Sequence, residues 1–142
     1  MMRAVGLDFG TTNSAIAVAA PGGAVELAKF EIERDFTTAF RSILYFDPEN
    51  LAAGGRPRAV AGPAAIDAYL KSRAHGRLIQ SMKSYLPSRL FQATSILGHT
   101  FSLEDLIATV VRELKAAAEA QFGALGPSVV VGRPVHFSGS RT

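Results

Sequence analysis

Cysteine is absent from this chain of 142 residues. Its absence excludes disulfide bonds and every metal site that is built on thiolate ligands, such as a zinc centre with cysteine ligands. A chain without disulfides does not depend on an oxidising compartment, because no covalent crosslink has to form there. We therefore expect the protein to reside in the cytoplasm.

Long apolar runs are also missing. The first ten residues, MMRAVGLDFG, lack the extended apolar segment and the small-residue cleavage site of a secretory signal. No segment approaches the roughly 18 apolar residues that a membrane-spanning helix needs. The sequence therefore predicts a soluble protein that is neither exported nor embedded in a membrane.

Clusters of charge and of histidine are the third absence. The fifteen Lys and Arg residues leave a net charge of +3, but they are scattered, with no basic run and no interleaved aromatic residues. Nucleic-acid binding is therefore not expected. His75, His99 and His136 lie far apart without the spacing of metal ligands, so a histidine metal site is not expected either.

Apolar residues are plentiful, at 48% of the chain, which is enough for one compact domain with a core. Apolar periodicity predicts three antiparallel strands, at 3–9, 14–20 and 24–30. The clearest element is a helix over 102–123, because its apolar residues recur three and four positions apart. Ser102 and Asp105 form a capping signature at its start, and Gly123 supplies the stop.

The segment between these elements has a different residue pattern, and we expect an insertion with its own small core over about 36–99. Within it the sequence predicts a strand at 42–46, a Gly/Pro-rich loop at 47–63 and a helix at about 64–74. After the long helix, the β-branched run at 127–132 predicts a strand buried on both faces and paired in parallel.

This order of elements is typical of one half of a ribonuclease-H-like α/β fold. The core would comprise residues 1–35 and 100–142, and a small α/β subdomain would be inserted at about 36–99. The chain stops at HFSGSRT, without a closing helix. We expect it to be one lobe of a larger domain.

The stretch GLDFGTTNS, residues 6–14, carries the clearest chemistry. Asp8 ends the first strand, and Gly10, Thr11, Thr12 and Asn13 follow it. Successive backbone N–H groups in such a bend can form an anion-binding concavity, and the threonines add hydroxyl donors. Asp8 offers a hard oxygen for Mg²⁺. A plain hairpin turn uses the same residue types, so both interpretations stay open here.

Three segments of the sequence resemble one family. GLDFGTTNSAIAV is similar to the first phosphate motif of the superfamily of actin, sugar kinases and heat-shock proteins, and its run GTTNS is typical of DnaK-type chaperones of the seventy-kilodalton heat-shock family. FSLEDLIATVVRELKAAAEAQFG resembles that family's helix F-(T/S)-P-E-E-I-S-A-x-(I/V)-L-x-x-L-K-x-x-A-E-x-x-(F/L)-G. VVVGRPVHF resembles its strand V-I-T-V-P-A-Y-F.

Other segments depart from the family pattern. TTAFRSILYF stands where the family has T-P-S-V-V-x-F, MKSYLPS where it has K-R-x-(I/L)-G-R, and GRPVHF where it has V-P-A-Y-F. These departures resemble the divergent bacterial YegD-like branch more than DnaK itself.

The resemblance implies roles for individual residues. Asp8 matches the aspartate on the magnesium side, and Gly10, Thr11, Thr12 and Asn13 match the loop around the β- and γ-phosphates. Two further matches concern catalysis: Lys83 corresponds to the catalytic lysine that holds the γ-phosphate and the attacking water, and Pro134 to the proline switch that relays the nucleotide state.

The resemblance thus implies the ATP-binding lobe of a DnaK-like chaperone ATPase. Its ligands would be ATP or ADP with Mg²⁺, and its partners protein clients and the second lobe of its own domain. Hydrolysis would belong to the full-length protein, and this lobe alone is expected to be inactive. The alternatives are a sugar kinase or actin-like member of the superfamily, or a nucleotide-sensing scaffold that does not hydrolyse ATP.

Overall fold

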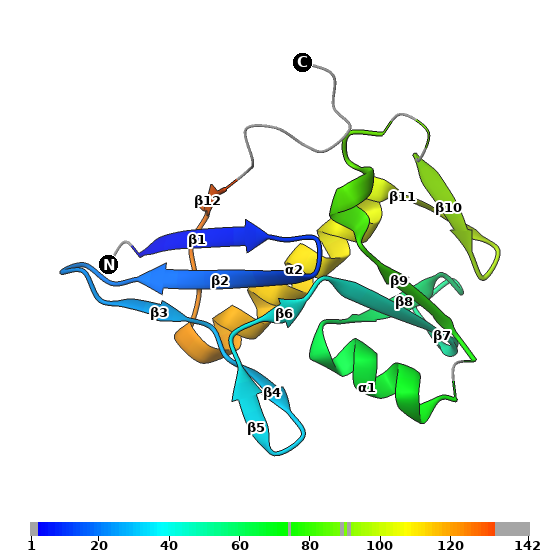
Figure 1. Ribbon diagram of the computed structural model, residues 1–142, viewed down its shortest axis with the longest axis horizontal. Helices are drawn as coiled ribbons and strands as arrows, with labels where there is room; N and C mark the ends of the chain where they lie inside the picture. Colours follow the sequence, from blue (N-terminus) through cyan, green and yellow to red (C-terminus); the bar gives the residue numbers. More distant parts are fainter. Residues whose placement is uncertain (1–2, 74, 89, 91, 133–142) are drawn as a thin grey trace.

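The computed structural model describes residues 3–73, 75–88, 90 and 92–132. It is a mixed α/β structure in which a long helix, α2, lies behind two sheets (Figure 1). The larger sheet has the strand order β12-β1-β2-β3, with β6 also paired to β2. Its strands are β1 (Ala4–Phe9), β2 (Asn13–Ala19), β3 (Val25–Leu27), β6 (Phe40–Arg41) and β12 (Val130–Val131).

The first three strands confirm the predicted antiparallel arrangement. In the β1–β2 pair Ala4 lies opposite Ala19 and Phe9 opposite Ser14, so the two strands are joined by a short connection that begins at Gly10. β3 pairs with the far end of β2, and β6 pairs with its near end, where Asn13 lies opposite Arg41. β6 therefore reaches the sheet beside the β1–β2 turn.

The second sheet is antiparallel, with the order β8-β7-β9, and the helix α1 packs on it. The prediction of a loop over 47–63 is wrong, because a hairpin occupies most of that range. The predicted short strand runs on to Leu51 and turns back with Gly54 and Gly55 at positive φ. The elements are β7 (Ile43–Leu51), β8 (Pro57–Ala61), β9 (Arg77–Gln80) and α1 (Pro63–Lys71), which covers most of the predicted helix.

Two small hairpins and one short helix complete the described elements. The hairpin β4–β5 projects from the end of the larger sheet beside α1, and β10–β11 leads into α2 (Figure 1). Between β9 and β10 the chain forms the 3-10 helix η1. Their bounds are β4 (Phe30–Ile32), β5 (Asp35–Thr37), η1 (Met82–Tyr85), β10 (Ala93–Ile96) and β11 (His99–Ser102).

Helix α2 (Leu103–Phe122) confirms the predicted helix, its caps included. The Ser102 hydroxyl accepts from the Asp105 N–H at 3.0 Å, and the Asp105 carboxylate accepts from the Ser102 N–H at 2.9 Å. Gly123 ends the helix at φ 78°. This reciprocal capping box satisfies backbone donors that the first turn of a helix leaves without partners.

The main core lies between α2 and the two sheets. One face of α2 is buried, and it packs against the inward-facing residues of β1 and β2 and against one side of β7. The members contributed by α2 are Leu103, Leu106, Val110, Leu114 and Ala118; those of the strands include Val5, Leu7, Phe9, Ile16, Val18, Leu44 and Phe46. β7 is buried on both sides, because Ile43 and Tyr45 face α1 in a second, smaller cluster with Ala65. The boundaries of an inserted subdomain stay a prediction.

β12 confirms one half of the prediction for 127–132 and corrects the other half. The strand pairs in parallel with β1, with Gly6 opposite Val130. Its residues are not buried, however, since Val130 is 73% exposed and Val131 53%. In the described part of the chain β12 pairs with β1 alone and joins neither hydrophobic cluster, which accounts for the exposure.

None of the described helices combines the length and apolar character that crossing a membrane requires.

Candidate functional site

The end of the β1–β2 hairpin brings together the polar residues that the sequence singles out. Strand alternation buries Leu7 and Phe9 against α2 and leaves Asp8 exposed on the opposite face of the sheet. In β2, Ser14 points inward and Asn13 outward. Asp8 lies opposite Ala15, so Asp8 and Asn13 are diagonal neighbours on the same open face, where such residues lie about 7–8 Å apart.

Gly10 makes the turn possible. A Cβ atom on Gly10 would lie 2.1 Å from the backbone oxygen of Asn13, far inside van der Waals contact. The sequence suggests that this glycine lets the chain approach a ligand; the structure gives a nearer reason, because the turn folds back on itself there. Only a residue without a side chain fits this conformation.

Thr11 and Thr12 carry the unused donors of the turn. Both residues are exposed, and neither their N–H groups nor their hydroxyls form a hydrogen bond with another residue of the described chain. The Thr12 carbonyl, by contrast, accepts from the Ser42 N–H at 2.9 Å, which ties the turn to the segment after β6. The turn is therefore anchored through its acceptor, and its donors remain available to a ligand.

A small cavity of about 40 Å³ lies beside the turn. Thr11 and Thr12 form one side of it, and the other side comes from two segments that are remote in sequence. Those segments contribute Arg41, Ser42, Ile43, Gln80 and Ser81. The cavity is large enough only for a few water molecules, so a larger ligand would lie over its mouth.

Ser42 and Ser81 fix the walls of this cavity. The Ser42 hydroxyl lies 2.7 Å from that of Ser14, and both side chains are buried. Ser81 adopts the left-handed conformation, at φ 60° and ψ 31°, which few residues other than glycine adopt. This conformation turns the chain from β9 into η1 directly at the cavity.

Lys83 and Pro134 differ in how the structure places them. Lys83 is half-buried in η1, two residues after Ser81, and its ammonium group makes no ion pair within the described ranges. Lys83 does not line the small cavity, although Gln80 and Ser81, which lie three and two residues before it, do. Pro134 lies outside the described residues.

A carboxylate centre for a metal is not preassembled. Within the part of the chain that the structure describes, no three His, Cys, Asp or Glu side chains come together as a metal site. Asp8 is the carboxylate nearest to the turn in sequence, and it has no ion pair or hydrogen bond with another described side chain. One free carboxylate suits Mg²⁺, which usually keeps water and phosphate oxygens as its other ligands.

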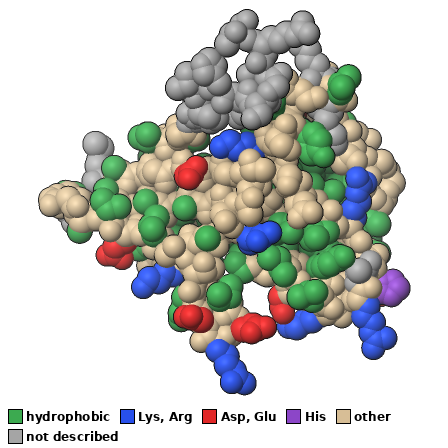
Figure 2. Space-filling view, viewed as in Figure 1, with side chains coloured by type: hydrophobic (Ala, Val, Ile, Leu, Met, Phe, Trp, Pro, Cys, Tyr) green, Lys and Arg blue, Asp and Glu red, His purple; other side chains and the backbone are tan. Residues whose placement is uncertain are grey.

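A wider groove of about 860 Å³ adjoins the turn. Asn13 and Arg41 line it on the side of the sheet, and the hairpin β4–β5 and α1 form its other walls. Figure 2 shows the hollow between the projecting hairpin and α1, with acidic and basic side chains around it. Arg41 thus lines both the groove and the small cavity.

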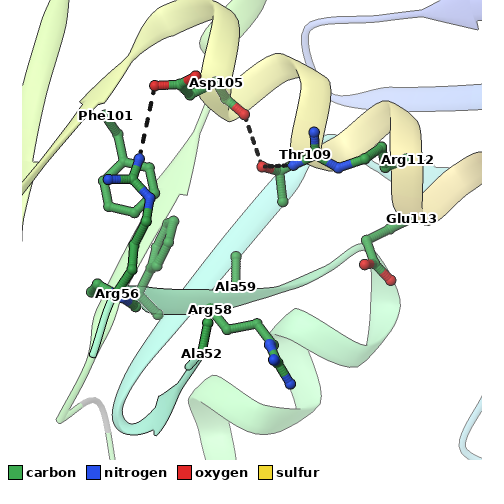
Figure 3. Close-up of a pocket in the computed structure, with 11 residues that line it drawn as sticks. Ala52, Arg56, Arg58, Ala59, Phe101, Asp105, Thr109, Arg112 and Glu113 are labelled. Carbon is green, nitrogen blue, oxygen red and sulfur yellow. Dashed lines mark hydrogen bonds and ion pairs between the residues drawn. The ribbon is translucent and has the colours of Figure 1, made fainter. Parts of the chain in front are cut away.

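A separate cavity of about 380 Å³ lies between β8, β11 and α2 (Figure 3). The guanidinium carbon of Arg56 stands 4.0 Å from the centre of the Phe101 ring, and Arg56 Nη2 donates to the Thr100 carbonyl at 3.3 Å. Arg112 donates to the Thr109 hydroxyl at 3.2 Å. Figure 3 shows the guanidinium groups of Arg56, Arg58 and Arg112 in different parts of the cavity, so they do not converge on one ligand position.

Two carboxylates line this cavity, those of Asp105 and Glu113, and the one of Asp105 is engaged. Asp105 Oδ2 accepts from the Ser102 N–H in the capping box and lies 3.9 Å from Arg56 Nη2. The hydrogen bonds from Ser102, the backbone one first, lower the pKa of Asp105 below its usual value, and the positive charge of Arg56 contributes in the same direction. We interpret this cavity as a structural junction rather than a ligand site.

Sequence reasoning missed Arg41, Ser42, Gln80 and Ser81 as neighbours of the turn. They come from two segments that meet there only through the pairing of β6 with β2 and of β9 with β7. One signal was present, because the segment TTAFRSILYF departs from the family pattern at this place.

Comparisons with known proteins relate the chain to one family. The sequence model of the family described as "Hsp70 protein" matches residues 4–141. The chaperone protein DnaK of Mycoplasma mycoides subsp. mycoides SC is 28% identical over 138 residues, which make up 96% of this chain and 20% of that relative. The chain thus spans about a fifth of the length of the curated relative that it matches.

Proposed function

The chain belongs to the Hsp70 family, and from that premise we propose that it forms the phosphate-binding side of a nucleotide site in a DnaK-like ATPase. The family has the fold of the actin and heat-shock ATPases. The observation that supports the proposal best is the turn at Gly10–Asn13. On its open face, the N–H groups and hydroxyls of Thr11 and Thr12 have no partner in the described part of the chain.

The finer architecture is part of the proposal. The order of elements is consistent with the ribonuclease-H-like core. Strands β1, β2 and β3 are antiparallel, α2 follows them, and β12 then pairs in parallel with β1. In this arrangement residues 1–35 and 100–142 form that core, and about 36–99 form an inserted subdomain. The opposite side of the nucleotide site would come from a second lobe.

The residues present fit a magnesium-bound triphosphate. The N–H groups and hydroxyls of Thr11 and Thr12 would donate to phosphate oxygens, and Asn13 would add an amide donor from the same face. Asp8 would hold Mg²⁺ through its free carboxylate. The ion, when bound, supplies positive charge against the negative charge on the phosphate oxygens during transfer.

Lys83 and Pro134 complete the proposal. Lys83 would direct its charge at the terminal phosphate, for which a compact ammonium group on a flexible stem is suited. Its place two residues after the cavity residue Ser81 supports this role. Pro134 would link the nucleotide state to the neighbouring domain, as the family resemblance implies.

The relative is named a chaperone, and we extend that activity to the whole protein as a proposal. ATP binding and hydrolysis would then control the affinity for unfolded protein clients. The nucleotide site described above is the part of that cycle to which this chain contributes.

Two variants of the whole protein test the catalytic part. Asp8→Asn preserves size but removes the charge, so Mg²⁺-dependent ATP turnover should fall by on the order of 10²-fold. Lys83→Ala should lower kcat and leave nucleotide affinity within a few-fold, because the lysine acts on charge that develops in the transition state.

Both outcomes are measured by steady-state hydrolysis together with a nucleotide-binding titration. Unchanged turnover in Asp8→Asn would remove Asp8 from the site, and an affinity loss with normal kcat in Lys83→Ala would contradict the catalytic role of the lysine. Binding without any hydrolysis in the unmodified whole protein would favour a nucleotide sensor instead.

A further inference from the structure

Arg41 occupies a position that the proposed site does not yet use. It lies opposite Asn13 in the β2–β6 pair, and directly opposed residues of an antiparallel pair point to the same face, with Cβ atoms about 4.5–5.5 Å apart. Ser14 and Phe40 form the next opposed pair, and both are buried. Alternation therefore places Arg41 on the open face, beside Asn13 and the turn.

The charge of Arg41 has no partner among the residues that the structure describes. The guanidinium group forms no ion pair or hydrogen bond with another described residue. Carboxylates are present in the same groove: Glu31 and Glu33 line it without pairing to Arg41, and Asp67 is paired with Lys71 at 2.8 Å. Arg41 thus remains a free cation within the described site.

Arg41 also lies next to the free donors. It lines the small cavity together with Thr11 and Thr12, and the following residue, Ser42, donates its N–H to the Thr12 carbonyl at 2.9 Å. An arginine beside two threonines with unused donors presents planar, charged N–H groups where phosphate oxygens would lie, and arginine suits phosphate because it can bind it in a bidentate manner.

The sequence departs from the family pattern at Arg41. In the pattern T-P-S-V-V-x-F, the last five positions correspond to Ser42–Phe46, so Arg41 stands where the pattern has proline. Proline offers neither charge nor a backbone donor at this position.

We infer that Arg41 is a further phosphate-binding residue, which adds a guanidinium group to the turn and strengthens binding of the polyphosphate part of the nucleotide. This inference rests on the proposed function, because it assigns a residue to that same site. It concerns phosphate affinity and is independent of whether ATP is hydrolysed.

The test is calorimetric titration of the whole protein with magnesium tripolyphosphate, magnesium ATP and adenosine. Arg41→Gln removes the charge and retains a polar side chain, and Arg41→Lys retains the charge without the planar fork. Arg58→Gln is the matched control, because Arg58 is an exposed arginine on another sheet with no ion pair to a described residue. Circular dichroism shows that each variant is folded.

We expect Arg41→Gln to raise the Kd for tripolyphosphate and ATP about fivefold to tenfold, Arg41→Lys to lie between it and the unmodified protein, and Arg58→Gln to change nothing. Should Arg41→Gln fail to fold, Arg41→Lys still tests the inference, because its Kd for tripolyphosphate and ATP should exceed that of the unmodified protein.

Two results would overturn the inference. The first removes only the role of Arg41, and the second also removes the proposed phosphate site. If the unmodified whole protein binds ATP and the Arg41 variants bind it equally well, or lose adenosine affinity to the same extent, Arg41 is not a phosphate ligand and the turn stands. If the unmodified whole protein binds neither ATP nor tripolyphosphate, the proposed phosphate site fails and the role of Arg41 fails with it.

Discussion

Arg56 and Arg41 line different cavities and differ in their contacts. In the cavity beside α2, Arg56 stacks on Phe101, donates to the Thr100 carbonyl and lies 3.9 Å from Asp105. In the cavity beside the β1–β2 turn, Arg41 has no partner in the described chain. Arg56 is thus held by an aromatic ring, a carbonyl and a carboxylate, whereas the guanidinium group of Arg41 remains available to a ligand beside the donors of the turn.

The backbone shows the same contrast. At the start of α2 the side chains of Ser102 and Asp105 satisfy two of the N–H groups that a helix leaves unpaired. At the turn the N–H groups of Thr11 and Thr12 receive no such side chain. The N-terminus of α2 is therefore closed to anions by its own cap, although a helix N-terminus is in general an anion site.

The largest effect should come from closing the turn. Gly10→Ala places a Cβ atom within 2.1 Å of the Asn13 backbone oxygen, so the backbone has to move. We expect the free energy of unfolding to fall by about 1–3 kcal/mol, as for other overpacked sites. ATP binding by the chain should be lost with it. Urea denaturation and a binding titration measure the two effects.

Gly6→Ala is the matched control for this substitution. Gly6 lies in β1, four residues before Gly10, and a Cβ atom there meets nothing within 4 Å. Alanine should leave both stability and binding unchanged or slightly improved. Equal losses in the two variants would show that the turn has no special requirement for glycine.

The effect of intermediate size is the difference in stability between an Arg56 and an Arg41 variant. Arg56→Ala removes the contact with Phe101 and should lower the free energy of unfolding by about 0.5–1 kcal/mol. Arg41→Ala should leave it within about 0.5 kcal/mol, as expected for an exposed side chain without partners. Thermal and urea denaturation of both variants measure these losses. A larger loss in Arg41→Ala than in Arg56→Ala would contradict a structural role for Arg56 and a free Arg41.

The sequence predicts the larger sheet and α2 well for a physical reason. Their signals are local: alternation in β1 and β2, and helical periodicity between Ser102 and Gly123. The turn is also local, since Gly10, Thr11 and Thr12 are adjacent.

The prediction failed where the structure depends on distant partners. The segment Asp47–Asn50 is polar and contains Pro48, so its sequence predicts a loop. In the structure it belongs to β7, which pairs with β8 and runs to Leu51. The valines before Gly132 read as buried, but their exposure depends on which elements cover β12. Arg41 became a neighbour of the turn only through the pairing of β6 with β2.

The smallest effect concerns the capped helix and its pH dependence. Because the pKa of Asp105 is lowered from 3.8 in the folded state, its contribution to stability is present above about pH 4 and is lost as the pH falls through the lowered pKa. Asp105→Asn should therefore cost about 0.5 kcal/mol near neutral pH and less in acid.

Urea denaturation across the acid range measures this effect. Glu113→Gln, on the same helix and without an ion pair to a described residue, serves as its control. A difference between Asp105→Asn and the unmodified chain that stays constant down to about pH 2 would contradict the lowered pKa.

The central claim is that the free donors of the β1–β2 turn bind phosphate, and NMR tests it most directly. Backbone amide spectra of the isotope-labelled chain are recorded during titration with magnesium ATP and, separately, with adenosine. Our account predicts that the Thr11 and Thr12 amides shift most, with ATP and not with adenosine. Unmoved amides at the turn, or the largest shifts around Arg56 and Arg112 beside α2, would contradict it.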